Sequence, residues 1–190
     1  KYLFAEALRK RGDAARAIVM YRHLADSLTG EQAELGVCVN RGMGLAALAL
    51  GQTELALASL KEAQQAQPEN ISLLRDLAGA YMTSLLPRDA SQMAEATLQL
   101  APHDPANLIW FKNIMVELGE TKRAKEALQR VIGLEPEQAS HRLQMARLEV
   151  ESGDVEAARA ILDELRDMPI DGEGLQETAY LYLRLQDSQT

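Results

Sequence analysis

The sequence has little of what strands, disulfide scaffolds and membrane spans require. Aromatic residues make up only 4% of the 190 residues, and there are 12 glycines, 6 prolines and one cysteine. Because strands favour aromatic and β-branched residues, this composition favours helices. The longest apolar run, Met43 to Gly51, is about nine residues, well short of the roughly 20 that span a bilayer. We therefore expect an all-α chain with no transmembrane segment in this sequence.

Other absences exclude whole classes of site. Cys38 alone cannot form an internal disulfide or a cysteine-based metal cage, and its neighbours Val37 and Val39 predict a buried or half-buried thiol. The three histidines show no metal-ligand spacing, and no phosphate-binding loop or nucleophile elbow appears. The net charge of −8 disfavours nucleic acid as a partner. We predict no catalytic residue, no cofactor, no metal and therefore no enzyme in this chain.

The cellular compartment stays open, because proteins without disulfides occur in the cytoplasm and in the bacterial periplasm alike. The sequence starts at Lys1, inside an apparent helix and without an initiator methionine. We expect it to be a piece of a longer protein.

Three columns of residues recur with one period, which is the signature of a repeat protein. Small turn positions step by 39, 34, 34 and 34 residues, an alanine follows each turn by five residues, and the prolines step by 34, 34 and 33. The columns are Gly12, Gly51, Leu85, Gly119, Gly153; then Ala17, Ala56, Ala90, Ala124, Ala158; then Pro68, Pro102, Pro136, Pro169.

Each column has a mechanical reason. Glycine ends the first helix of a pair in the left-handed conformation, and proline ends the second helix. Asp13, Asp154 and Asp89 are predicted N-caps of second helices, and Asn70 is a predicted N-cap of a first helix. Between these marks the apolar residues recur at helical spacing, so we expect short helices that are stable only when packed on their neighbours.

These columns resemble the tetratricopeptide repeat over essentially the whole chain. A small residue in the first helix, the turn glycine, the second-helix alanine, a bulky residue four later and the closing proline all match its pattern. The resemblance implies an all-α, right-handed superhelical solenoid of antiparallel helix pairs. We expect a single array over 1–190, with repeats at 1–30, 31–70, 71–104, 105–138 and 139–171 and a capping or half-repeat helix in 172–190.

The departures from the pattern carry further expectations. Repeat one is longer, through the segment 28–32, and lacks a closing proline, which predicts extended helices there. Lys112 stands in the small-residue column and Glu149 in a large-residue column. We expect these two side chains either to loosen the local packing or to lay their stems along it with their heads in water.

The resemblance also implies a binding surface, because first helices line the concave face of such arrays. Following that face at helical spacing gives a predicted groove for a peptide or protein segment. Arg41 and Arg75 occupy equivalent places and could attract a carboxylate together, or be solvated or paired with nearby acids. Trp110 lies at the groove rim, where it either anchors a partner or wedges against the next repeat. The groove residues are Arg41, Leu45, Arg75, Met82, Ile109, Trp110, Asn113, Leu143, Arg147 and Tyr180.

We therefore interpret the chain as an interaction scaffold that helps to organise a larger complex. One alternative is a structural spacer or self-assembly segment of a bacterial envelope, exopolysaccharide-export or pilus-assembly protein, with self-association through the terminal helices. Another alternative is a non-catalytic repeat region attached to a transferase domain.

Overall fold

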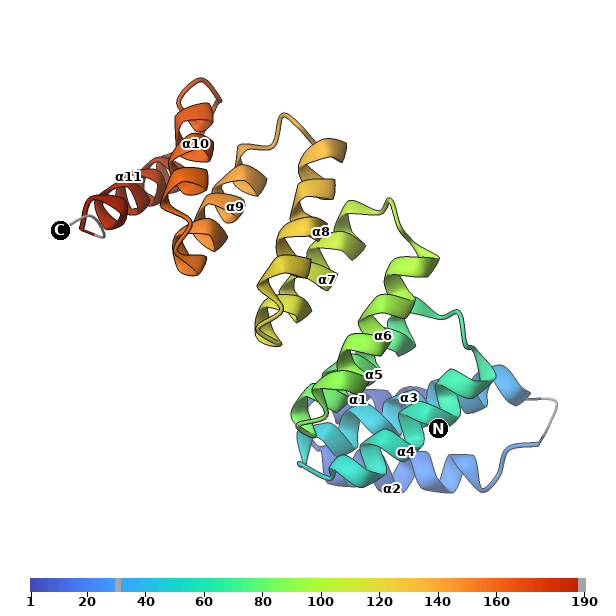
Figure 1. Ribbon diagram of the computed structural model, residues 1–190. Coiled ribbons are helices and arrows are strands. Elements are labelled where there is room, and N and C mark those ends of the chain that lie inside the picture. The colour runs from blue at the N-terminus through green and yellow to red at the C-terminus, as the bar shows by residue number, and fades with distance from the viewer. Residues whose placement is uncertain (30–31, 188–190) are drawn as a thin grey trace. The chain divides into compact units, whose positions relative to one another are not determined.

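The computed structural model describes residues 1–29 and 32–187, and these residues form eleven helices and no strand (Figure 1). This confirms the all-α prediction. The chain divides into two compact units, Lys1–Leu100 and Ala101–Thr190, named unit 1 and unit 2 below. Each unit is built of helix pairs, as predicted. The interpretation of residues 1–190 as one continuous array stays a prediction.

Unit 1 contains three helix pairs. In each pair the second helix packs against the first, and the first helices α1, α3 and α5 also contact one another in succession. The helices are α1 (Tyr2–Lys10), α2 (Ala14–Ala25), α3 (Ala33–Ala49), α4 (Thr53–Ala66), α5 (Ile71–Thr83) and α6 (Pro87–Leu100).

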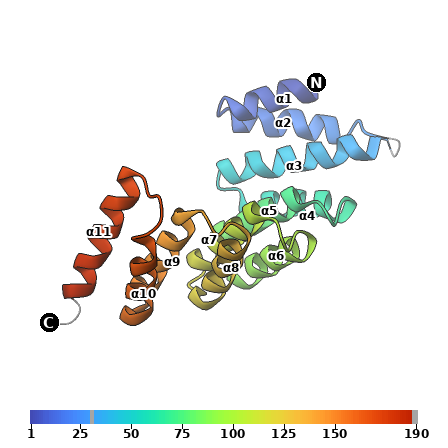
Figure 2. The same ribbon diagram turned by 90° about the horizontal axis from the view of Figure 1, so that it is seen from above.

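Unit 2 contains two helix pairs followed by one further helix. The pairs are α7 with α8 and α9 with α10, and α11 packs against both α9 and α10 (Figure 2). The helices are α7 (Pro105–Glu117), α8 (Thr121–Leu134), α9 (Ala139–Ser152), α10 (Val155–Leu165) and α11 (Gly172–Asp187). None of the described helices combines the length and apolar character needed to cross a membrane.

The turn inside each helix pair has the same geometry, as the glycine column predicts. Gly12, Gly51, Gly119 and Gly153 have φ of 84°, 70°, 75° and 80°. In all five turns the residue after the turn position donates its N–H to the carbonyl five residues earlier, at 2.8–2.9 Å, which is the Schellman arrangement. Leu85 fills this column in the third pair with φ of 57°, although a side chain there is strained.

The predicted N-caps are confirmed with one exception. Asp13, Asp154 and Asn70 each accept a hydrogen bond from a backbone N–H in the first turn of their helix. The prediction for Asp89 was wrong, because α6 already begins at Pro87 and places Asp89 in its first turn. Proline is well suited to the first helical position, since it has no N–H to satisfy there.

The prediction of extended helices in repeat one was also wrong. The helices α1 and α2 have 9 and 12 residues, whereas α3, which follows the longer segment, has 17. The extra residues therefore lie partly in the connection after Ala25 and partly in α3. The predicted break near residue 30 and the end of the predicted segment 172–190 fall on 30–31 and 188–190, outside the described residues.

Close packing in unit 1 depends on two glycines of α3. A methyl group at Gly44 would lie 2.6 Å from Leu60 Cγ and 3.1 Å from the Ala56 carbonyl oxygen, both on α4. A methyl group at Gly42 would lie 2.5 Å from Tyr21 Cζ on α2. No Cβ fits at these distances, so glycine lets α3 approach both neighbouring helices.

A small polar cluster satisfies the buried hydroxyl group of Tyr21. The fully buried Tyr21 donates its hydroxyl to Glu6 Oε1, and Arg9 Nη2 lies 2.9 Å from Glu6 Oε2. The hydrogen bond from Arg9 lowers the pKa of Glu6, with the Tyr21 hydroxyl acting in the same direction and burial opposing. Burial and the hydrogen bond to Glu6 raise the pKa of Tyr21. Glu6 thus stays ionised and Tyr21 protonated over the ordinary pH range.

Candidate functional site

On the first-helix face of unit 1, Arg41 is engaged in an ion pair. Arg41 Nε on α3 lies 2.5 Å from Asp76 Oδ2 on α5, and the Asp76 side chain is largely buried. Of the two alternatives for Arg41, pairing with a nearby acid is therefore what the structure contains. Arg75 is half-buried and precedes Asp76 in sequence. The joint attraction of a partner's carboxylate by Arg41 and Arg75 stays a prediction.

The two apolar groove residues of unit 1 are only partly accessible. Leu45 and Met82 are both half-buried. Met82 packs against the core cluster that contains Leu60, Leu77 and Tyr81. Met82 thus contributes part of its side chain to the core of unit 1.

In unit 2 a hollow of about 370 Å³ opens between the first helices α7 and α9. No Cα pair of α7 and α9, both fully described, lies within 8 Å, whereas α1 with α3, α3 with α5, and α9 with α11 do approach that closely. Two predicted groove residues, Asn113 and Arg147, are exposed and line this hollow. Its other lining residues are Lys112, Val116, Glu117, Gln144, Leu148 and Glu151.

A side-chain hydrogen bond links α7 and α9, whose backbones do not come into close contact. Lys112 Nζ donates to Gln144 Oε1 at 2.9 Å. Burial lowers the pKa of Lys112, and the positive charge of Arg147 lowers it further. Arg147 in turn makes a two-pronged contact from Nε and Nη2 to Glu177 Oε1 on α11, with Nε at 2.6 Å. The hollow is therefore lined by the half-buried ammonium group of Lys112, the exposed amide of Asn113 and the exposed guanidinium group of Arg147.

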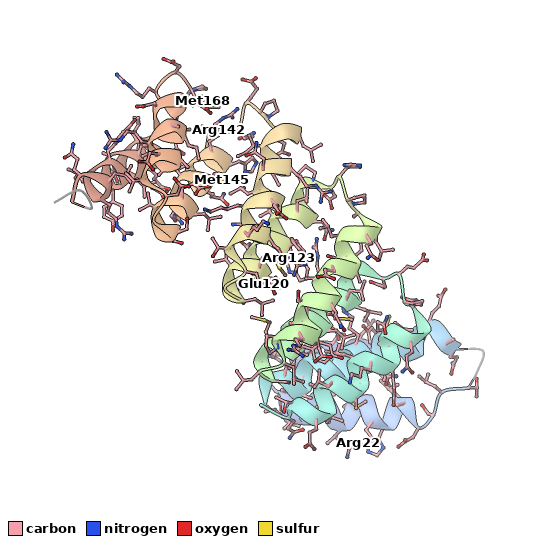
Figure 3. The ribbon with its side chains drawn as sticks, in the orientation of Figure 1. Arg22, Glu120, Arg123, Arg142, Met145 and Met168 are labelled. Carbon is pink, nitrogen blue, oxygen red and sulfur yellow. The ribbon has the colours of Figure 1, made fainter. Side chains whose placement is uncertain are left out.

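Leu143, a predicted groove residue, lies mostly in the core of unit 2. Its side chain is 7% exposed and belongs to the core cluster of α9, α10 and α11. Only its edge lines a second hollow, of about 510 Å³, between the start of α9 and the α10–α11 connection. The adjacent Arg142 turns toward α10, where its Nε lies 3.6 Å from Glu164 Oε2 (Figure 3).

The remaining predicted residues of unit 2 are spread over its face. Ile109 and Trp110 on α7 are half-buried, and Tyr180 on α11 is 56% exposed. Of the unit 2 groove residues, the structure thus brings only Asn113 and Arg147 together in one hollow.

Comparisons with known proteins agree with this architecture. Sequence profiles of the tetratricopeptide repeat match residues 42–70 and residues 115–168. The chain is a tetratricopeptide-repeat protein. Arrays of this kind are non-catalytic scaffolds for protein interactions, since stacked repeats create extended binding surfaces. Among curated proteins, none matches the sequence.

Several solved tetratricopeptide structures have the same fold. A MamA chain that runs from residue 41 to the end, from Desulfovibrio magneticus RS-1, is 16% identical with a TM-score of 0.65, and the match covers 87% of this chain and 90% of that chain. YrrB, described as a TPR protein with an unusual peptide-binding site, is 18% identical with a TM-score of 0.63, over 93% and 89%. TPR-like repeats of a Podosopora anserina kinesin light chain are 18% identical with a TM-score of 0.69, over 87% and 91%. At these identities the likeness concerns the fold.

Sequence reasoning missed three polar residues of this tetratricopeptide face as site residues. Lys112, Gln144 and Glu177 carry the polar contacts around the hollow. Lys112 was singled out only as a departure from the small-residue column. Its half-buried ammonium group is hydrogen-bonded rather than left in water. The available sequence signal for this contact was Lys112 in the small-residue column, together with the polar Gln144 near the equivalent position, Ala146, of the next repeat.

Glu149, the second departure, is also paired rather than solvated. Its Oε2 lies 2.5 Å from Lys125 Nζ on α8, and both side chains are mostly buried. At the turn between α7 and α8, Arg123 Nη1 lies 2.7 Å from Glu120 Oε2 and its guanidinium lies 5.3 Å from the centre of the Phe111 ring (Figure 3). In this tetratricopeptide unit, charged side chains thus take part in packing.

The described residues contain no candidate metal site and one exposed thiol. No group of three or more His, Cys, Asp or Glu side chains there could hold a metal ion. The prediction that Cys38 is buried or half-buried was wrong: the residue is exposed, while Val37 and Val39 are buried. On a helix, neighbours in sequence point in different directions, so two buried valines do not bury the residue between them.

Proposed function

We propose that this tetratricopeptide chain binds a peptide or protein segment against the α7–α9 face of unit 2. The observation that carries the proposal is the hollow of about 370 Å³ that joins the exposed Asn113 and Arg147 to the half-buried Lys112. Ligand sites in helical proteins favour such concavities, where a few polar groups are placed among apolar ones. The proposed role is binding, without catalysis by this chain.

The lining favours an extended segment with accessible main-chain groups. Asn113 offers an amide N–H and a carbonyl, and Gln144, whose carbonyl already accepts from Lys112, offers its amide N–H; these groups can pair with a peptide N–H and C=O. Val116 and Leu148 lie beside them as apolar contacts for one ligand side chain. The peptide-binding site described for YrrB is in accord with this use of the fold. A nucleic-acid ligand is disfavoured by the net charge of −8.

Peptide selection from a displayed library, followed by affinity measurement, tests the proposal. Selected peptides are labelled and titrated by fluorescence anisotropy with the whole chain and with Asn113→Ala and Lys112→Met. We expect each variant to weaken binding about tenfold, which corresponds to roughly 1.4 kcal/mol for lost hydrogen bonds to the ligand.

A matched control separates loss of the site from loss of surface charge. Arg159 is exposed on α10, away from the α7–α9 hollow, so Arg159→Ala should bind like the unchanged chain. Circular dichroism spectra verify that each variant is folded. Equal affinity of the unchanged chain and both hollow variants would reject the assignment of the site.

A further inference from the structure

The second hollow of unit 2, of about 510 Å³, lies between the start of α9 and the connection from α10 to α11, and it is named the α9–α11 hollow below. Its lining comes from three segments, 137–143, 169–171 and 173–177. The apolar part of the lining includes the edge of Leu143, the half-buried Ile170 and the exposed Pro169. A concave surface with apolar walls from several elements is the usual form of a binding site.

The connection that forms one wall of this hollow is packed onto the start of α11. Asp171 Oδ1 accepts a hydrogen bond from the Gly174 N–H at 2.8 Å, in the first turn of the helix. A methyl group at Gly174 would overlap Ile170 Cγ2, so the glycine permits a close approach there. The wall that contains Pro169 and Ile170 is therefore part of the folded unit.

The charged part of the lining is entirely acidic. Four carboxylates line the α9–α11 hollow, and among the described residues no Lys, Arg or His side chain does so. The α7–α9 hollow, by contrast, has two cationic and two acidic side chains in its lining. Residues 101–190 contain 17 acidic and 10 basic residues, whereas residues 1–100 contain 11 and 10. The electrostatic field of unit 2 therefore attracts positive charge, and the α9–α11 hollow is where the lining offers carboxylates alone.

Two of the four carboxylates remain available to a partner. Glu177 is paired with Arg147, and Asp171 accepts the hydrogen bond at the start of α11. Glu137 and Glu173 are exposed, and neither forms an ion pair within the part of the chain that the structure describes. They belong to different elements, since Glu137 precedes α9 and Glu173 lies in the first turn of α11. A cation bound in the hollow can therefore interact with both.

We propose that the α9–α11 hollow binds an arginine side chain of a protein partner. The aliphatic stem of the arginine packs on Leu143, Pro169 and Ile170, as long charged side chains commonly do on apolar surfaces. Its guanidinium group lies between Glu137 and Glu173, because a planar fork of five N–H donors can bond two carboxylates at once. The α9–α11 hollow is separate from the α7–α9 hollow, so this proposal and the proposed peptide site can fail independently.

Two short peptides that differ only in charge test the proposal. The isotope-labelled chain is titrated with an acetylated and amidated Ala-Arg-Ala peptide, and with the same peptide carrying citrulline, the neutral isostere of arginine. We expect the arginine peptide to cause saturable chemical-shift changes at the backbone N–H groups of Ser140 and Gly174, and the citrulline peptide to bind about tenfold more weakly. Absence of saturable changes at these two residues would overturn the proposal, and so would equal binding of the two peptides.

Two double variants that lose the same charge locate the site. Glu137→Gln with Glu173→Gln should weaken binding of the arginine peptide about tenfold. Glu126→Gln with Glu156→Gln removes two exposed carboxylates from the second helices α8 and α10 and should bind like the unchanged chain. Equal affinities of the two double variants would show that the hollow does not hold the arginine, and the proposal would fail. Circular dichroism verifies that both variants are folded.

Discussion

One repeat column is filled in opposite ways in the two units. In unit 1 it holds Gly44, where a Cβ would lie 2.6 Å from Leu60, so α3 and α4 approach very closely. In unit 2 the same column holds Lys112, whose side chain reaches across to Gln144 on α9. At this position unit 1 thus depends on close backbone approach, and unit 2 depends on a polar contact between helices. The repeat tolerates both because each helix needs to complement only its immediate neighbours.

The largest expected effect is overpacking in unit 1. Gly44→Val should lower the free energy of unfolding by about 3 kcal/mol, because its branched side chain must displace Leu60 or α4. Lys112→Val, the matched change in unit 2, should cost about 1 kcal/mol through the lost hydrogen bond to Gln144. Urea denaturation followed by circular dichroism measures both. Equal losses would remove the distinction between the two units.

Breaking an ion pair in unit 2 should have an intermediate effect. Lys125→Met leaves the mostly buried Glu149 carboxylate without its cation, so we expect a loss of about 2 kcal/mol. Adding Glu149→Leu, which restores a large apolar residue to its column, should recover most of that loss. Thermal and urea unfolding of both single variants and the double variant give the coupling energy. A double variant no more stable than Lys125→Met would contradict the pairing.

The strained turn of unit 1 offers a stabilising change. Leu85 has φ of 57° and is 86% exposed, so Leu85→Gly should raise the free energy of unfolding by about 1 kcal/mol. At the same column in unit 2, Gly119→Ala should lower it by about 1 kcal/mol, because Gly119 has φ of 75°. The two changes should therefore move the midpoint of denaturation in opposite directions. A destabilised Leu85→Gly protein would show that the leucine side chain has a packing role.

The smallest expected effect is a pH dependence in unit 1. The folded state lowers the pKa of Glu6 from 4.5, so its ionised form stabilises the fold above about that pH. This contribution disappears as pH falls through the lowered pKa. Comparison of Glu6→Gln with the unchanged chain in urea should show a difference on the order of 1 kcal/mol or less at pH 7 that shrinks below pH 4. A difference that stays constant with pH would exclude the charge of Glu6 as its cause.

The repeated parts of the fold were predictable, because each column reports a local physical need. The four left-handed glycines and the caps Asp13, Asp154 and Asn70 follow from residue type and spacing alone. The left-handed Leu85 sits in the predicted column, but its residue type gives no sign of that conformation.

The site was less predictable, because it depends on contacts between repeats. Arg41 pairs with Asp76 across 35 residues and Arg147 pairs with Glu177 across 30 residues. The repeat columns do not specify which residues pair in this way. Asn113 and Arg147 are exposed and Leu143 is buried, and the groove itself stays a prediction. The spacing of α7 and α9, which creates the hollow, results from the packing of whole helices.

Chemical-shift mapping by nuclear magnetic resonance tests the central claim most directly. The isotope-labelled chain is titrated with a peptide selected for binding, and the side-chain amide of Asn113 and the indole N–H of Trp110 serve as probes on α7. We predict that the largest shifts cluster on α7 and α9 around Lys112, Asn113 and Gln144. Shifts confined to the second helices α8 and α10 would contradict the account.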